Sequence, residues 1–163
     1  MKKILLFLLS VAVSGQFAYS RDVLHTENTT IVLDAEVGKD LQIVYYGARL
    51  SDTDVENLRF AGVRPQRAYP AHGLIGKEEE ALSVVFPDGN VTLDLKVTGV
   101  SRSSWEDGEV LEITSRDTFY PFMVKAFYKT YRSEDMISTW TELTNEGKKP
   151  MTLTRFDSGT LPF

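Results

Sequence analysis

Short β-rich runs separated by turn residues limit most strongly what this chain can fold into. Residues 91–97 alternate apolar and polar side chains with a period of two, which is typical of a half-buried antiparallel strand. Outside residues 1–20, no stretch has the apolar period of an amphipathic helix. The pattern therefore predicts an all-β fold, an antiparallel β-sandwich. The predicted strands are residues 30–33, 41–46, 82–86, 91–97, 110–114, 122–131, 136–145 and 151–156.

The stretches between these runs are rich in turn residues. Pro87, Asp88 and Gly89 form a strong turn signal after the third run. Residues 51–56 are polar and acidic, so we expect a loop there. The chain has no internal repeat and no low-complexity linker, so it is expected to form one domain over residues 21–163.

The first twenty residues have the features of a secretory signal peptide. Lys2 and Lys3 precede an apolar stretch, and Ala18 and Ser20 place small residues before a cut after Ser20. A membrane anchor is the alternative, but the apolar stretch is shorter than the roughly 20 residues that span a bilayer. We predict cleavage after Ser20 and a periplasmic or extracellular mature protein that is not held in a membrane.

Composition excludes several classes of protein. The net charge is −5 and no Lys/Arg cluster occurs, which argues against nucleic-acid binding. The chain has no cysteine, so disulfides and thiolate zinc sites cannot form. No glycine-rich phosphate loop occurs either, and no cofactor is predicted.

Residues 69–95 hold the most reactive-looking side chains. Glu78 and Glu80 would share one face of an extended chain with α-carbons about 6.5 Å apart, a spacing within the range of glycosidase acid pairs. Three consecutive glutamates are, however, more typical of a solvated loop, because burying unpaired carboxylates is costly. His72 could join them at a metal, but His25 is distant and cysteine is absent. We therefore predict no catalytic residue and no metal site here.

Two tryptophans could stack on sugar rings or pack within the sheet. Trp140 lies inside a predicted strand, so packing is expected. Trp105 begins a predicted turn and is the candidate for substrate binding.

The order of several short motifs resembles the N-terminal β-sandwich of glycoside hydrolase family 36, the melibiase-type α-galactosidases. The motifs are YYGARL at 45–50, YPAHG at 69–73, ALSV at 81–84, DGNVTLDL at 88–95, LEITSRD at 111–117, VKAFY at 124–128, MISTWTELTNEG at 136–147 and MTLTRFDSG at 151–159. The resemblance implies a supersandwich-like domain followed by a (β/α)₈ barrel that carries two catalytic aspartates. On this basis we expect the chain to stop before the barrel, with its sandwich incomplete at the C-terminal end, and to be inactive alone.

The resemblance also implies a role for the segment after the Tyr-Gly strand. In the family an acidic residue there reaches the sugar pocket, often across a subunit interface. Asp52 and Asp54 lie in this segment and are candidates for substrate binding, with a solvated acidic turn as the alternative. Residues 76–81 depart from the family's Gly-Asp-Phe-Arg-like run.

The expected partners are an α-galactoside, through the barrel, and further copies of the chain in a homo-oligomer. The main alternative is a stand-alone exported carbohydrate-binding sandwich that uses Trp105. A third hypothesis is a periplasmic adhesion or assembly domain that offers a strand edge to its partners.

Overall fold

The computed structural model describes residues 21–58, 62, 64–73 and 79–160, so the predicted signal peptide lies outside the described residues. Three sheets are present, and all ladders between their strands are antiparallel, which confirms the predicted all-β class. The first sheet contains β1 (Arg21–His25), β2 (Thr29–Asp34), β3 (Gln42–Ala48) and β4 (Gln66–Arg67). The second contains β6 (Leu95–Trp105), β7 (Gly108–Asp117), β8 (Phe122–Tyr131) and β9 (Met136–Asn145). The third pairs β5 (Leu82–Val85) with β10 (Thr152–Phe156).

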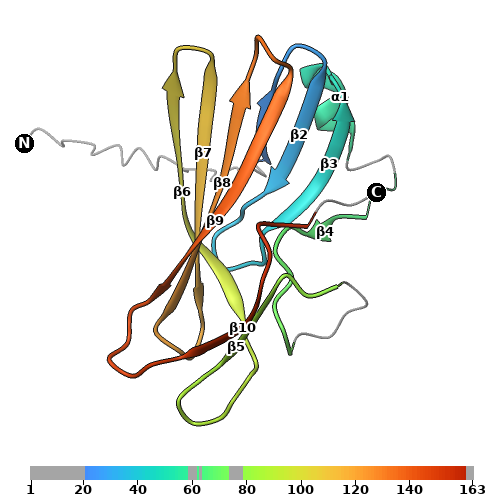
Figure 1. The fold of residues 1–163 in the computed structure, drawn as a ribbon. Helices are drawn as coiled ribbons and strands as arrows, with labels where there is room; N and C mark the ends of the chain where they lie inside the picture. The colour runs from blue at the N-terminus through green and yellow to red at the C-terminus, as the bar shows by residue number, and fades with distance from the viewer. Residues whose placement is uncertain (1–20, 59–61, 63, 74–78, 161–163) are drawn as a thin grey trace, which may run out of the picture.

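The long β6–β9 sheet forms one layer of the sandwich along the whole molecule (Figure 1). The β1–β4 sheet covers its upper half, and β5 with β10 crosses its lower half. Every second side chain of β8 is buried, so period-two alternation along the strand directs one face into the core. The upper core contains Leu24, Ile31, Leu33, Leu41, Ile43, Val97, Leu111, Ile113 and Tyr128. The lower core contains Tyr69, Leu82, Val84, Phe86, Leu93, Leu95, Phe122 and Val124.

The strands β8 and β9 have the predicted bounds, whereas the prediction of a strand over residues 91–97 is partly wrong. Residues 91–94 lie outside any strand, and β6 begins only at Leu95. Their backbone N–H groups have other acceptors: Leu93 donates to the His72 carbonyl (3.0 Å) and Asp94 to the Asp117 carboxylate (2.7 Å). The alternation still decides burial, because Leu93, Leu95 and Val97 are all buried.

The prediction of a loop over residues 51–56 is wrong, because Asp52–Asn57 forms the helix α1. Ser51 accepts from the Asp54 N–H while the Asp54 side chain accepts from the Ser51 N–H, which is a capping box. Val55 and Leu58 pack on Val32 and Val44. A cap and a small apolar contact thus hold this helix of six residues, whose sequence shows no apolar period.

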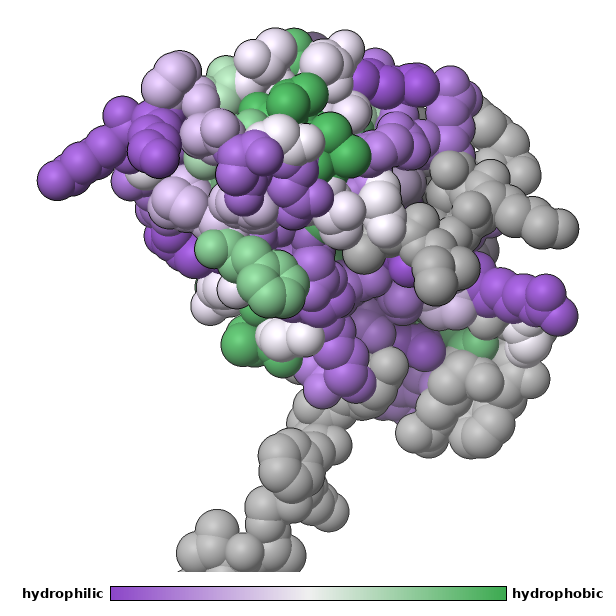
Figure 2. Space-filling model, turned by 90° about the horizontal axis from the view of Figure 1, so that it is seen from below, coloured by the Kyte–Doolittle hydropathy of each residue, from purple (hydrophilic) through white to green (hydrophobic). Residues whose placement is uncertain are grey.

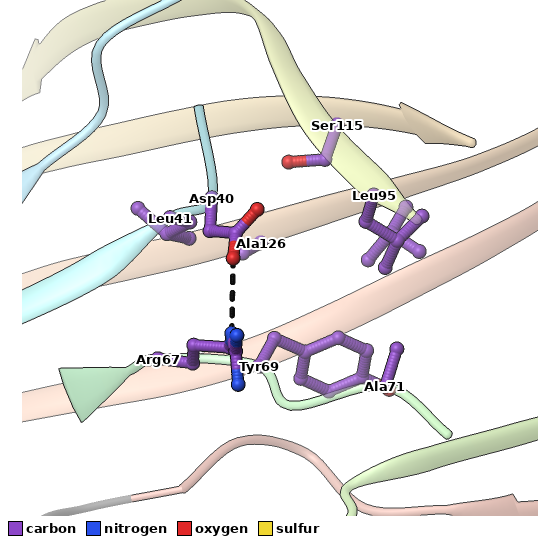
Figure 3. Close-up of a pocket in the computed structure, with 9 residues that line it drawn as sticks. Asp40, Leu41, Arg67, Tyr69, Ala71, Leu95, Ser115 and Ala126 are labelled. Carbon is purple, nitrogen blue, oxygen red and sulfur yellow. Dashed lines mark hydrogen bonds and ion pairs between the residues drawn. The ribbon is translucent and has the colours of Figure 1, made fainter. Parts of the chain in front are cut away.

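One group of charged side chains joins the two layers beside a cavity of about 20 Å³, and Figure 3 shows its Asp40–Arg67 pair. Asp40 accepts from Arg67 Nε at 2.9 Å and from Lys96 Nζ at 2.6 Å. Burial raises the pKa of the Asp40 carboxyl, but the hydrogen bonds from Lys96 and Arg67 outweigh it and hold that pKa below its ordinary value. The carboxylate therefore stabilises the fold above pH about 4 and ceases to do so as the pH falls through its lowered pKa.

We expect Asp40→Asn to lower the free energy of unfolding by about 1–2 kcal/mol at pH 7, because two charge-assisted hydrogen bonds weaken. The difference from the wild type should shrink as the pH falls below about 4 toward the lowered pKa of Asp40, where the wild-type carboxylate itself takes up a proton. Urea unfolding of both proteins across this pH range measures the difference in stability. Glu36→Gln is the control, since the Glu36 side chain forms an exposed ion pair with Lys39. A difference in unfolding free energy between wild type and Asp40→Asn that stays constant with pH would contradict the proposed charge pairing.

Candidate functional site

The three predicted site residues lie at one end of the sandwich. We call this the upper end: it consists of α1 and turn residues 26–28, 106–107 and 132–135 (Figure 1). Asp52 and Asp54 belong to α1, directly after β3, and Trp105 is the last residue of β6. The fold thus brings to one end of the sandwich side chains that are about 50 positions apart in the sequence.

The two aspartates of α1 are held differently. Asp54 accepts from Ser51 Oγ at 2.6 Å, and this bond together with that from the Ser51 N–H holds the pKa of Asp54 below its ordinary value. Its carboxylate is therefore engaged in the helix cap. Asp52 is exposed in the first turn, and its charge acts on His25, whose pKa is nevertheless lowered by burial and by the Arg49 charge. Of the two, Asp52 is the better placed to meet a ligand.

Trp105 is held in place by its neighbours. Its indole Nε1 donates to the Thr130 carbonyl at 3.1 Å, and its ring meets Tyr131 edge to face with centroids 5.0 Å apart. Lys129 Nζ lies 3.9 Å from the centroid of the Trp105 ring. The indole N–H and one ring face thus have protein partners, so packing accounts for this side chain. A role in substrate binding stays a prediction.

Trp140 stacks on Phe127 in the neighbouring strand, with centroids 4.7 Å apart and planes 3° from parallel. The two residues are paired in the β8–β9 ladder. Cross-strand aromatic pairs of this kind stabilise a sheet, as the packing interpretation of Trp140 requires.

An open depression of about 610 Å³ lies at the upper end. Charges of both signs line it, including Arg49, Arg132, Asp107 and Glu109. Most already have protein partners: Ser133 Oγ donates to Asp107 at 2.7 Å, and Arg102 Nη1 lies 2.7 Å from Glu109. Sequence reasoning missed these residues because they come from two hairpins and from the connection between β3 and α1, and they form no local motif. The surface can hydrogen-bond a polar ligand.

The glutamates near His72 do not pair with one another where the structure describes them. Glu80 Oε1 lies 2.7 Å from His72 Nδ1, and Glu79 accepts from Arg155 Nη2 at 2.9 Å. Glu78 lies outside the described residues. Within the described ranges, no three His, Asp or Glu side chains are placed to hold a metal ion. That part of the chain also has no helix with the length and apolarity to cross a membrane.

The fold and the upper end together define an antiparallel β-sandwich domain with an open, polar surface at one end. The family model described as "Glycosyl hydrolase family 36 N-terminal domain" matches residues 39–163. The chain therefore belongs to glycoside hydrolase family 36, as its N-terminal domain, and the resemblance seen in the sequence is confirmed.

Solved α-galactosidases share the fold. AgaB of Geobacillus stearothermophilus is 19% identical with a TM-score of 0.75, over 91% of this chain and 24% of that one. A variant of AgaA from the same organism, in complex with 1-deoxygalactonojirimycin, is 19% identical with a TM-score of 0.75, over 86% of this chain and 24% of that one. The Lactobacillus brevis α-galactosidase is 15% identical with a TM-score of 0.71, over 88% of this chain and 24% of that one. This chain thus spans about a quarter of their length. The comparison with curated proteins gave no match.

Proposed function

We propose that this chain is the exported N-terminal domain of an α-galactosidase-like glycoside hydrolase. The match to the family's N-terminal domain over residues 39–163 carries the proposal. The parent enzyme would remove terminal α-galactosyl groups by a retaining double displacement that uses two carboxylates of a barrel domain. The domain described here would support that barrel and supply no catalytic group. Export rests on the leader pattern of residues 1–20.

Two surfaces support roles in the whole enzyme. At the upper end, Asp52 occupies the segment after the Tyr-Gly strand and is the candidate to close the galactoside pocket. On β10, all five residues are exposed, and Leu153 and Phe156 present apolar side chains to solvent. Exposed apolar side chains on a strand favour a contact with another domain or another subunit, so β10 is the candidate surface for assembly.

We expect the isolated chain to show no turnover of an aryl α-galactoside, because its described carboxylates either have basic, hydroxyl, amide or backbone N–H partners or are exposed on the surface. The assay compares the purified chain with a buffer control over many hours. Hydrolysis above the control by the isolated chain would overturn the scaffold role.

N-terminal sequencing of the exported protein is expected to begin at Arg21.

A stand-alone carbohydrate-binding module is the second candidate, favoured by the partly exposed Trp105 beside Tyr131 and Lys129. Tryptophan fluorescence during a galactoside titration separates the two functions. Trp105→Phe and Trp140→Phe form a matched pair, because each leaves a single tryptophan. A saturable change that disappears only in Trp105→Phe would favour the binding module, whereas the scaffold role expects no change at Trp105.

A further inference from the structure

The opposite end of the sandwich holds a pocket that the proposed function does not use. We call it the lower pocket: it is lined by Pro87, Asp88, Tyr120, Pro121, Gly147, Lys148, Lys149 and Met151. Its volume is about 360 Å³, which lies within the range of about 300–1,000 Å³ typical of small-molecule sites. Figure 2 looks onto this end and shows hydrophobic surface beside strongly hydrophilic side chains.

The walls of the lower pocket come from three turns that are fixed against one another. Gly147 packs on Pro121 so closely that an added β-carbon would lie 2.8 Å from Pro121 Cγ. Glu146 N–H donates to the Pro121 carbonyl at 2.8 Å. The Asp117 carboxylate accepts from the Tyr120 N–H at 2.7 Å. These contacts preorganise the pocket, which lowers the entropic cost of binding a ligand.

One aromatic ring forms the apolar wall. Phe86 stacks on Tyr120 with centroids 3.7 Å apart and planes 11° from parallel. Phe86 is fully buried and is itself held by an edge contact with Phe122. One face of Tyr120 is thus covered by the core, so a ligand can meet only the opposite face. The ring is a rigid, supported platform beside two prolines.

Charged groups of opposite sign form the polar part of the lower pocket. Asp88 accepts from Tyr120 Oη at 2.7 Å, and Asn90 Nδ2 donates to the same Tyr120 oxygen at 2.9 Å. The hydrogen bond from Tyr120 contributes most to holding the pKa of Asp88 below its ordinary value, and the charge of Lys149 adds to it. Asp88 is therefore a carboxylate at neutral pH with a lysine near it. The pocket offers one strong acceptor and two ammonium donors, Lys148 and Lys149, around an aromatic face.

We propose that the lower pocket binds a pyranose sugar. A sugar ring has an apolar C–H face for Tyr120 and hydroxyl groups that can donate to Asp88 and accept from Lys149 at the same time. An anionic ligand would meet the Asp88 carboxylate, and a cationic ligand would meet the two lysines. A purely apolar ligand would desolvate all three charges without partners. The inference does not depend on the proposed scaffold function.

The test uses the full chain and methyl α-galactopyranoside, with binding followed by NMR chemical-shift changes. We expect saturable shifts that map to the three turns of the lower pocket. Glycerol is the control ligand, because it has hydroxyl groups but no ring face to stack on Tyr120, and we expect no binding. Methyl α-glucopyranoside and galacturonate, titrated in parallel, show whether the site selects the axial hydroxyl or a carboxylate.

Two variants locate the site. Lys149→Ala changes an exposed side chain and should weaken binding at least about tenfold, the loss expected for one charged hydrogen bond. Asp88→Asn keeps the shape of the turn and should weaken binding similarly. Phe119→Ala is the matched control: Phe119 is in the same turn as Tyr120 and 85% exposed, but it does not line the lower pocket. Binding to Phe119→Ala should equal that of the wild type.

Three outcomes would overturn the inference: no saturable shifts with any of the sugars, equal binding by the wild type and Lys149→Ala, or loss of binding in Trp105→Phe instead. The last result would place the sugar at the upper end. The first two results leave the scaffold function untouched, whereas the third would favour the carbohydrate-binding module over it. Hydrolysis of an aryl α-galactoside by the isolated chain would overturn the scaffold function independently.

Discussion

Gly108→Ala is expected to destabilise the chain by about 3 kcal/mol or more, because the new methyl group has no space. A β-carbon built at Gly108 would lie 2.3 Å from the Thr130 carbonyl oxygen and 2.6 Å from Thr130 Oγ1. The obstacle is backbone of the neighbouring strand, which cannot rotate away as a side chain could. To admit the methyl group, β7 and β8 would have to separate at the upper end.

The separation would also break two hydrogen bonds at this end. The Thr130 carbonyl accepts from Trp105 Nε1, and Thr130 Oγ1 accepts from the Glu109 N–H at 2.9 Å. Urea unfolding followed by circular dichroism measures the stability, and Trp105 fluorescence reports the local change. Gly99→Ala is the matched control in the same sheet, since nothing lies within 4 Å of a β-carbon at Gly99. It should be neutral or stabilising by up to about 1 kcal/mol. Equal stabilities for the two variants would contradict the clash.

The sequence predicted the strands whose alternation coincides with sheet pairing. β8 and β9 have the predicted bounds because their apolar face packs on the core and turn residues stand at both ends. β6 shows the limit of this reasoning. Residues 98–104 of β6 are mostly exposed and, apart from Val100, have no large apolar side chain, so no apolar pattern marks them as a strand. Pairing with β7 holds them in place, and pairing partners cannot be read from one strand alone.

The candidate site was predicted less completely than the fold. The motif order led to Asp52 and Asp54, and the sequence placed them in a loop. A capping box in the sequence Ser51-Asp-Thr-Asp54 could have indicated the helix, but six residues are too few to show an apolar period. Arg49, Asp107 and Arg132 line one depression only because two hairpins and the β3–α1 connection lie at the same end of the sandwich. The lower pocket likewise depends on contacts between turns, so no local sequence pattern predicts it.

Phe86→Ala is expected to lower the free energy of unfolding by about 3–5 kcal/mol, which is the usual cost of removing a buried phenylalanine ring. Phe86 is 2% exposed and lies in the lower core between β5 and β8. The substitution would remove the ring that stacks on Tyr120 and the edge contact with Phe122. Phe156→Ala is the control, because Phe156 is about half exposed on β10 and should lose less than about 1 kcal/mol. Urea unfolding compares the two, and similar losses would contradict the assignment of Phe86 to the core.

A second substitution at Phe86 separates its role in packing from its role beneath the lower pocket. Phe86→Leu keeps an apolar side chain in the core and should lose only about 1–2 kcal/mol, so the chain stays folded. It nevertheless removes the flat ring that fixes the plane of Tyr120. If Tyr120 is the sugar platform, Phe86→Leu should weaken binding of methyl α-galactopyranoside several-fold while the unfolding transition stays cooperative. Unchanged binding in a folded Phe86→Leu chain would mean that the orientation of Tyr120 does not matter to the ligand, and the platform role would have to be abandoned.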